Sequence, residues 1–450
     1  MYILATMEEL NDDAFDIDAL RQFKTSDEAI AYKKKYYSGE EYQDLLVIFI
    51  GWGELMLLTR KQEEGLKIAV ERYRNKEKWT CIGGFAGSGK STLIKFIIDA
   101  LGIDSDDVAY VAFTGKAATV LKQRGCQNAI TAHKLLYDAK PTRDGKYIFI
   151  PKAKLERNYK IIVVDEVSML PKTMWNILLR HNVYVLATGD PEQLPPINPD
   201  EDNHILDNPH VFLDEIMRQA QESEIIRLSM HIRAGNPIAT FPAAGNQVQI
   251  LTSDKIVSGL YEWPDQILCA TNATRNTINN TVRSLRGYGK EPQPEDKIIS
   301  LKNHWDTLSI ESNPLTNGTI GSLLGGFNKE QISVPYYISQ KSIPVLIADI
   351  QNEDLDIYKN ICIDYTALTT GEKFLTPRQE YMMNKSKILP EAPYEFAYGY
   401  AITTWKAQGS EWDKVLGFEE KFPYDPIIHR RFLYTTVTRA KEKLVLVTNN

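Results

Sequence analysis

The sequence predicts an α/β protein with two lobes, each built on a parallel β-sheet that helices cover. The first lobe is indicated by short apolar strands with helical or looped segments between them, at 79–83, 108–113, 161–164 and 183–188. A second set of the same character begins at 266–270 and ends with 443–447. The chain has 450 residues, which exceeds the usual size of one domain, so accessory units are also expected.

The expected boundaries follow from these strands and from the segments between them. Residues 1–55 form a short N-terminal α+β extension, with a strand at 2–6, a helix at 26–37 and a strand at 45–50. Isoleucine, valine, tyrosine and turn residues are frequent in 332–376, which predicts a small inserted β domain. The complete division is 1–55, 56–215 for the first lobe, 216–320 with 396–450 for the second lobe, and 321–395 for the insertion.

Composition indicates an ordinary globular protein, with 43% hydrophobic and 25% charged residues. The longest apolar run, 45–58, is interrupted by Gly51, Gly53 and Glu54 and is shorter than the roughly 20 residues that cross a bilayer. No secretory signal precedes it. We therefore expect a cytoplasmic protein without a membrane contact. The four cysteines are scattered, which argues against a zinc site or a disulfide framework. The net charge of −7 gives nucleic-acid binding no general electrostatic support, so any such contact requires local basic grooves.

A glycine-rich segment, Gly84-Phe-Ala-Gly-Ser-Gly-Lys-Ser91, follows the strand at 79–83 and opens a helix at 90–101. This is the Walker A pattern in the context that it requires. Backbone N–H groups of such a loop enclose phosphate, the lysine reaches the β- and γ-oxygens, and the serine ligates Mg²⁺. We therefore expect ATP and Mg²⁺ here, bound by Gly87, Ser88, Gly89, Lys90, Ser91 and Thr92; the plain alternative is a glycine-rich turn without a ligand.

The strand at 161–164 ends in two carboxylates, Asp165 and Glu166. An apolar strand that ends in this way can hold Mg²⁺ and activate water, so Asp165 is the candidate metal ligand and Glu166 the candidate general base. An Asp-Glu pair after a strand is more often the start of a solvated loop. The position of the pair about 75 residues after the phosphate loop favours the catalytic interpretation.

Five further segments are similar to motifs of the superfamily 1 helicases, and they follow the phosphate loop in the family's order: 112–121, 131–136, 189–196, 404–411 and 433–441. Over residues 58–450 the pattern most resembles the RecD-like and Dda-like 5′→3′ branch. The resemblance implies two RecA-like P-loop NTPase lobes, a β-hairpin wedge and an SH3-like insertion. It also implies an ATP-dependent DNA helicase and single-strand translocase that acts in replication, recombination or repair.

The same resemblance assigns roles around the nucleotide. Gln62 would read the adenine, Gln193 would sense the γ-phosphate, and Glu411 would contact the nucleotide. Arg218 and Arg439 would stabilise charge on the phosphoryl group as arginine fingers. The plain alternatives are a solvent-exposed glutamine for Gln62 and a surface salt bridge for Arg218.

Candidate contacts to single-stranded DNA also follow from the resemblance: Thr114, Lys116, Thr131, His133 and Pro195 in the first lobe, and Asn272, Arg275 and Lys406 in the second. Hydroxyls, amides and cations suit phosphates, which fits binding that does not depend on sequence. His133 taken alone could equally be a core histidine. Trp405 stands where the family usually has histidine; its indole either stacks on a base or packs between the second lobe and the insertion.

A hairpin is predicted around Asp144-Gly145, with Tyr147 and Phe149 on one strand face, inside the inserted stretch 136–159. The resemblance makes this hairpin the wedge that splits a duplex, while aromatic residues on a hairpin often only cover apolar surface. The expected partners are single-stranded DNA and tailed duplex DNA, bound by a monomeric motor. Residues 1–55 would dock a replication or recombination protein or brace the first lobe.

Two other functions remain open at this stage. The chain could be an accessory subunit in which ATP acts as a switch, although a pure binder does not need the carboxylate of Glu166 or the guanidinium of Arg439. It could also be a motor that acts on RNA. Competition between DNA and RNA strands for stimulation of ATP hydrolysis separates the two motor readings.

Overall fold

The computed structural model describes residues 2–6, 22–23, 45–51, 54–141, 147–195, 202–217, 222–302, 304–310, 314–339, 341–353, 355–386 and 391–448. The chain divides into two compact units. The first comprises residues 1–111, 155–191 and 198–222, and the second comprises residues 112–154, 192–197 and 223–450. Within the described part of the chain, no helix has both the length and the apolar character needed to cross a membrane.

The N-terminal residues contribute a small antiparallel sheet with the strand order β2-β1-β3-β4. Its strands are β1 (Tyr2–Thr6), β2 (Gln22–Phe23), β3 (Leu45–Gly51) and β4 (Glu54–Leu57). The two predicted strands are confirmed. The apolar run 45–58 was read as one segment, whereas the structure divides it into β3 and β4, which pair as a hairpin. The predicted helix at 26–37 lies outside the described residues.

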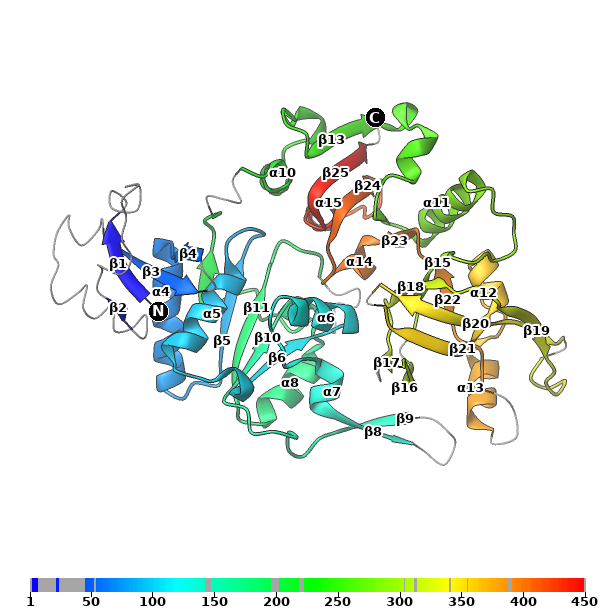
Figure 1. The fold of residues 1–450 in the computed structure, drawn as a ribbon, viewed down its shortest axis with the longest axis horizontal. Coiled ribbons are helices and arrows are strands. Elements are labelled where there is room, and N and C mark those ends of the chain that lie inside the picture. Colours follow the sequence, from blue (N-terminus) through cyan, green and yellow to red (C-terminus); the bar gives the residue numbers. More distant parts are fainter. Residues whose placement is uncertain are drawn as a thin grey trace. The chain divides into compact units, whose positions relative to one another are not determined.

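The first unit is built on parallel strands that lie side by side in the order β12-β5-β11-β10-β6 (Figure 1). They are β5 (Trp79–Gly84), β6 (Val108–Ala112), β10 (Ile161–Val164), β11 (Tyr184–Gly189) and β12 (Val211–Leu213). All four predicted strands are confirmed, within one residue at each end. Because parallel strands place their carboxyl ends at one edge, the loops that follow β5, β10 and β11 meet there.

Helices cover this sheet because successive strand residues point to opposite faces. On one face, α4 (Arg60–Arg74) and α5 (Lys90–Ala100) bury Leu66 and Leu93 in one core with Ile82 of β5. The helix α4 starts at a capping box, in which the Thr59 hydroxyl accepts from the Gln62 N–H while the Gln62 side chain accepts from the Thr59 N–H. The predicted helix at 90–101 is therefore confirmed.

The stretch 112–154 of the second unit contains α6 (Gly115–Gln123), β7 (Ala129–Thr131), α7 (Ala132–Leu136) and then a hairpin of β8 (Tyr137–Pro141) and β9 (Tyr147–Pro151). The hairpin is antiparallel, with Tyr137 opposite Pro151 and Pro141 opposite Tyr147. The predicted hairpin is thus confirmed as a hairpin. Its turn, including Asp144-Gly145, lies outside the described residues.

The second unit has its own parallel sheet with the order β13-β25-β24-β14-β23. Its strands are β13 (Val248–Thr252), β14 (Gln266–Cys269), β23 (Ala401–Thr403), β24 (Trp412–Phe418) and β25 (Ala440–Thr448). Its helices are α10 (Glu224–Arg233), α11 (Asn272–Leu285), α14 (Thr404–Ala407) and α15 (Pro426–Val437). Two parallel sheets with covering helices confirm the predicted two-lobe α/β architecture.

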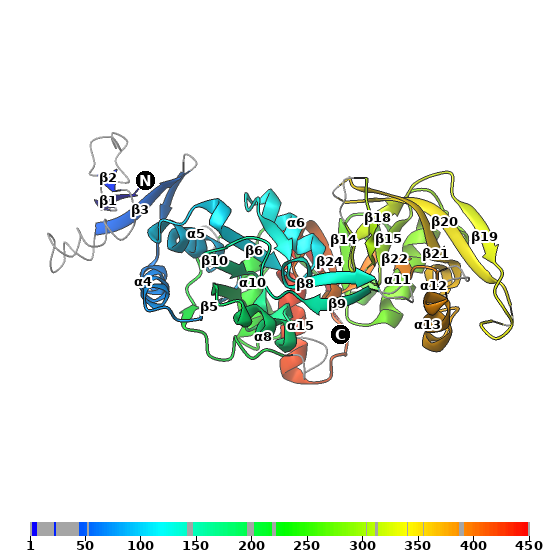
Figure 2. The same cartoon turned by 90° about the horizontal axis from the view of Figure 1, so that it is seen from below.

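The predicted inserted β domain is an antiparallel sheet with the order β19-β20-β18-β15-β22, to which β21 adds by pairing with β20 (Figure 2). Its strands are β15 (Lys297–Ser300), β18 (Ile320–Leu323), β19 (Asn328–Ile332), β20 (Ile343–Asn352), β21 (Ile357–Asp364) and β22 (Phe396–Tyr398). The sheet includes β15 and β22, which flank the predicted range 321–395. The insertion also contains two helices that the sequence did not predict, α12 (Tyr365–Thr370) and α13 (Pro377–Lys385).

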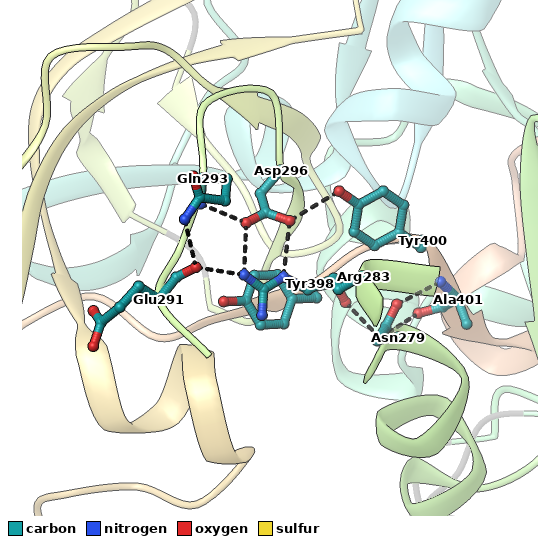
Figure 3. A network of polar contacts seen from close by, with 8 residues as sticks. All are labelled: Asn279, Arg283, Glu291, Gln293, Asp296, Tyr398, Tyr400 and Ala401. Carbon is teal, nitrogen blue, oxygen red and sulfur yellow. Dashed lines mark hydrogen bonds and ion pairs between the residues drawn. The ribbon is translucent and has the colours of Figure 1, made fainter. Parts of the chain in front are cut away.

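A buried polar network joins the insertion to α11 (Figure 3). Arg283 of α11 forms a two-pronged ion pair with Asp296, with Nε–Oδ1 and Nη2–Oδ2 distances of 3.0 and 3.1 Å. The Tyr400 hydroxyl donates to Asp296 Oδ1 at 2.9 Å, and the Arg283 guanidinium lies 4.1 Å from the centre of the Tyr398 ring. These residues come from α11 and from the segments where the chain enters and leaves the insertion, so the network fixes the base of the insertion to the helix.

Asp296→Ala removes one partner of this pair and should lower the free energy of unfolding by about 3–5 kcal/mol. The reason is that the Arg283 side chain, 5% exposed, is left as a buried cation without its counterion. Urea denaturation of the purified chain measures the loss. The matched control is Asp254→Ala, because the Asp254 side chain is exposed; an equal loss in both variants would contradict the role of the buried pair.

Candidate nucleotide site and nucleic-acid interface

The predicted phosphate loop connects β5 to α5 in the first unit. Gly87 and Gly89 adopt left-handed φ angles of 77° and 79°. A Cβ on Gly89 would lie 2.3 Å from Gln62 Nε2, so a larger residue would displace the Gln62 amide as well as strain the left-handed backbone. Gly89 is also the N-cap of α5 and provides no side-chain cap, which leaves the first N–H groups of an eleven-residue helix for an anion.

The polar side chains of the loop also fit a polyphosphate. Lys90 Nζ donates to the carbonyl oxygens of Gly84 and Phe85, at 2.7 and 3.0 Å, and is therefore held over the loop. The Ser88 hydroxyl is buried and has no hydrogen-bond partner among the described residues. Ser91 and Thr92 follow on the first turn of α5, where Ser91 is exposed. This donor set matches the predicted ATP phosphates, with the Ser91 hydroxyl as a ligand for Mg²⁺.

Gln62 and the segment after β12 hold the phosphate loop in place through hydrogen bonds to its carbonyl oxygens. Gln62 is fully buried, and its Nε2 donates to the carbonyl oxygens of Ser88 and Gly89, at 3.4 and 3.2 Å. The Met217 N–H donates to the Gly87 carbonyl at 3.0 Å. The structure thus commits both ends of the Gln62 amide to the protein, whereas adenine recognition by Gln62 remains a prediction. Arg218, which directly follows Met217, lies outside the described residues.

The two predicted carboxylates lie at the carboxyl end of β10, on the sheet edge that carries the phosphate loop. Asp165 Oδ1 accepts from the Thr188 hydroxyl at 3.0 Å and from the Glu166 N–H at 3.1 Å. These bonds orient the carboxylate and leave its second oxygen for a metal ion. Glu166 has a left-handed φ of 49°, a conformation that costs free energy in a residue with a side chain and is found at functional sites.

The segment that carries Gln193 is hydrogen-bonded to two other predicted motif segments. Gln193 is 7% exposed, and its neighbour Leu194 donates its N–H to the Thr435 hydroxyl at 3.0 Å. The Gln408 amide donates to the Leu194 carbonyl at 2.6 Å. The segments 189–196, 404–411 and 433–441, which are far apart in sequence, therefore meet at Leu194. A movement of the Gln193 segment should therefore also displace the segments 404–411 and 433–441.

Arg439 and Glu411 make contacts that the sequence did not predict. Arg439 is 3% exposed, and its guanidinium donates to the carbonyl oxygens of Thr435 and Ser410, both at 3.2 Å, and to the Thr438 hydroxyl at 3.3 Å. Glu411 forms an ion pair with Arg124, the C-cap of α6, with an Nη2–Oε2 distance of 2.6 Å. The finger role of Arg439 and the nucleotide contact of Glu411 remain predictions.

Two predicted DNA contacts, Arg275 and Lys406, form a cation pair with neutral partners. Arg275 is 6% exposed and donates through Nε and Nη2 to the amide oxygen of Asn276, at 3.2 and 2.9 Å. Lys406 Nζ donates to Asn317 Oδ1 at 2.7 Å. Burial, and then the positive charge of Arg275, lower the pKa of Lys406 to about 8. Both cations are partly desolvated, and the hydrogen bonds described above go to neutral amide oxygens. Such an arrangement favours binding of an anion such as a phosphate.

Other predicted DNA contacts lie at helix starts or in half-buried places. Thr114 and Thr131 are the N-caps of α6 and α7, and their hydroxyls accept from the N–H groups of Ala117 and Lys134, both at 3.2 Å. Asn272 is exposed on the first turn of α11, and Pro195 is half-buried. The side chains of Lys116 and Tyr147 lie outside the described part of the structure.

His133 belongs to an aromatic cluster at the base of the hairpin. Its ring lies 5.9 Å from the rings of Tyr137 and Phe149 and 6.0 Å from that of Phe113, measured between centroids. Burial lowers the pKa of His133 to about 4, so the imidazole is neutral near pH 7. A cationic contact to phosphate is therefore not what this environment favours. Phe149 keeps 36% of its surface exposed.

Trp405 packs within the second lobe. Its ring stacks on that of Phe432 at 6.0 Å between centroids and lies 6.1 Å from that of Phe422. Both neighbours belong to α15 or to the loop before it. Sequence reasoning missed Phe422 as a neighbour because Trp405 lies on α14 and Phe422 on the loop before α15, far apart in the sequence.

Three further residues were not singled out by the sequence reasoning. Asn317 had a usable signal, since Asn-Gly marks a tight turn, but nothing indicated that the turn reaches Lys406. Glu420 accepts from the Thr274 hydroxyl at 2.6 Å and from the Thr271 hydroxyl at 3.2 Å at the start of α11. Thr435 binds the Leu194 backbone. Glu420 and Thr435 act through tertiary contacts for which no local pattern exists.

In comparisons with known proteins, this chain is similar to helicases. Residues 58–254 match the family model described as an AAA domain, and residues 398–447 match the UvrD-like helicase C-terminal domain. The ATP-dependent RecD2 DNA helicase of Deinococcus radiodurans is 26% identical over 387 residues, which cover 80% of this chain and 45% of that protein. The ATP-dependent DNA helicase dda of Enterobacteria phage T4 is 25% identical over 452 residues, which cover 85% of this chain and 98% of that protein.

Solved structures give a further likeness. The crystal structure of Pif1 helicase from Candida albicans has a TM-score of 0.46 and 18% identity, and the match covers 87% of this chain and 94% of that one. The chain spans about half the length of the Deinococcus relative and nearly all of the phage relative.

Proposed function

Because the chain belongs to the superfamily 1 helicases, in the branch that contains RecD-like and Dda-like proteins, we propose that it is an ATP-dependent DNA helicase. It translocates along single-stranded DNA in the 5′→3′ direction and unwinds duplexes. The observation that carries the DNA contact is the cation pair of Arg275 and Lys406, held by the neutral amides of Asn276 and Asn317. Such a pair suits the phosphates of a strand that is bound without regard to sequence.

The first unit supplies the nucleotide chemistry. ATP with Mg²⁺ brings a γ-phosphoryl group that can be transferred to water. Lys90 and the N–H groups at the start of α5 hold the phosphates, while Ser91 and Asp165 hold the ion. Glu166 accepts a proton from the attacking water, and Gln193, Arg218 and Arg439 complete the set from the helicase resemblance. Gln62 keeps the loop in shape through Ser88 and Gly89, in addition to its proposed contact with adenine.

Hydrolysis must be repeated because each base-pair step resists separation by about 1.4 kcal/mol. The proposal therefore couples each turnover to a step of the strand past the cation pair. Helicase relatives are the basis for three finer proposals: the hairpin β8–β9 acts as the wedge, the insertion is an SH3-like domain that covers the strand, and the motor works as a monomer. Residues 1–55 are proposed to dock a replication or recombination protein.

The cheapest test of the substrate is stimulation of ATP hydrolysis by unstructured DNA and RNA strands of equal length. We expect DNA to raise turnover at least about tenfold and RNA to compete poorly for the same site. Stimulation by RNA alone would replace DNA with RNA as the substrate. Steady hydrolysis that neither strand changes would favour the alternative of an ATP-dependent switch.

The affinity for single-stranded DNA should depend on pH because of Lys406. The ammonium is present below a pKa of about 8 and is lost above it, so affinity for single-stranded DNA should fall as the pH rises from 7 to 9. Loss of one phosphate contact should also make the slope of log K against log salt shallower by about 0.7. Fluorescence anisotropy with a labelled oligonucleotide measures both effects.

The matched variant for this test is Lys406→Arg, because a guanidinium stays charged at pH 9. It should bind DNA with little change in affinity between pH 7 and pH 9. An unchanged pH dependence in Lys406→Arg would contradict the assignment of the titration to Lys406.

A further inference from the structure

Four aromatic rings form a continuous series from the core of the second lobe to its surface. Phe432 is fully buried and stacks on Trp405, with 6.0 Å between centroids and 20° between planes. Trp405 contacts Phe422 at 6.1 Å, and Phe422 contacts Tyr424 edge to face at 5.8 Å. Exposure rises to 40% at Phe422 and 83% at Tyr424. Neither the nucleotide residues nor the cation pair account for this aromatic series.

The loop that carries the exposed rings, residues 419–425, is anchored at both ends. Near its start, the Glu420 carboxylate accepts from the N–H groups of Ala270 and Thr271 and from two threonine hydroxyls at the start of α11. At its end, Asp425 caps α15 by accepting from the N–H groups of Ile427 and Ile428, both at 2.9 Å. Glu420 and Asp425 thus hold the two ends of the loop in place. The rings of Phe422 and Tyr424, which lie between them, face solvent.

The aromatic series lies on the same sheet edge as the cation pair. The strands β14, β23 and β24 are parallel neighbours, so the segments after their carboxyl ends meet at one edge. The segment after β14 carries Arg275, the one after β23 carries Trp405 and Lys406, and the one after β24 is the aromatic loop. Lys406 directly follows the tryptophan on which Phe422 rests. Lys421, exposed beside Phe422, adds a further positive charge.

We propose that Phe422 and Tyr424 form a base-stacking site for single-stranded nucleic acid, beside the phosphate contact at Lys406. This inference rests on the proposed function and extends it. Every nucleobase has an apolar face that stacks on an aromatic ring, so such a site grips the strand without reading its sequence. Phe432 and Trp405 support the platform from within the core, and the cations nearby hold the phosphates on either side of the stacked base.

The test compares Tyr424→Leu with the wild-type chain on two labelled strands of equal length, oligo(dT) and a strand of abasic sites. Anisotropy titrations at fixed salt give the affinities. Loss of one stacking ring should weaken binding to oligo(dT) about tenfold, which corresponds to about 1.4 kcal/mol. The abasic strand has no bases to stack and should bind the wild type and the variant equally. Tyr424→Phe keeps the ring and should bind oligo(dT) like the wild type.

A matched control is Val257→Ala, since Val257 is a 68% exposed apolar residue outside the insertion and far from this loop in the sequence. It should leave both affinities unchanged, and thermal melting should show that all variants are folded. Equal binding of oligo(dT) by Tyr424→Leu and the wild type would overturn the stacking site, as would equal losses on both strands. If the wild type bound neither strand, the proposed function itself would fail, and the stacking site with it.

Discussion

Lys90→Ala is expected to abolish DNA-stimulated ATP hydrolysis, with a fall of at least about 10²–10³-fold in turnover. Lys90 Nζ lies over the phosphate loop and donates to the carbonyl oxygens of Gly84 and Phe85. It is the cation that can stabilise the charge that develops on the γ-phosphate. Alanine leaves the loop without this charge while the glycines and α5 keep their geometry. Coupled-enzyme assays with and without single-stranded DNA measure the loss.

Lys95→Ala is the matched control, because Lys95 is an exposed lysine on the same helix. It should hydrolyse ATP at the wild-type rate and melt at the wild-type temperature. Normal turnover by Lys90→Ala would contradict the assignment of the phosphate site. A Lys90→Ala chain that no longer melts cooperatively would instead show that the lysine is needed for folding.

Glu166→Gln should lower turnover by about 10²–10⁴-fold while ATP still binds. The amide cannot accept the proton of the attacking water, yet it has the size and polarity of the carboxylate, so the left-handed conformation at φ 49° is retained. Asp165 keeps its bonds to Thr188 and to the N–H of residue 166. Equilibrium binding of a fluorescent ATP analogue should therefore stay within a few-fold of wild type.

Glu64→Gln serves as the control for this charge change, since Glu64 is exposed on α4 and should be neutral to the exchange. A loss of turnover in Glu166→Gln that came with an equal loss of nucleotide affinity would point to a binding role. Retention of full turnover would exclude Glu166 as the general base.

The elements that the sequence predicted well are those whose signal is local. Apolar strands, the glycine loop and the carboxylates after β10 each carry their pattern within a few residues, and the structure confirms both parallel sheets around them. The hairpin strands were also predictable, because turn residues and alternation lie close together. The edges of the insertion were not, since β15 and β22 join its sheet through pairing with strands from the other end of the insertion.

The contacts of the candidate site were harder to predict because they depend on tertiary structure. Gln62 bonds with residues 26 and 27 positions away, and its full burial follows from the packing of α4 on the loop. His133 has the same sequence context whether it is charged or neutral, and only its aromatic surroundings lower its pKa. The pairing of Lys406 with Asn317 joins residues 89 positions apart, so no window of sequence contains it.

The central claim, a motor that moves 5′→3′ and separates strands, is tested most directly by unwinding of tailed duplexes. Two substrates share one duplex and differ only in whether the single-stranded tail is 5′ or 3′, and strand separation is followed with ATP and Mg²⁺ in the presence of a trap. The account predicts unwinding of the 5′-tailed duplex and none without ATP. Unwinding only from the 3′ tail would contradict the direction, and no unwinding of either substrate despite DNA-stimulated hydrolysis would contradict the helicase function.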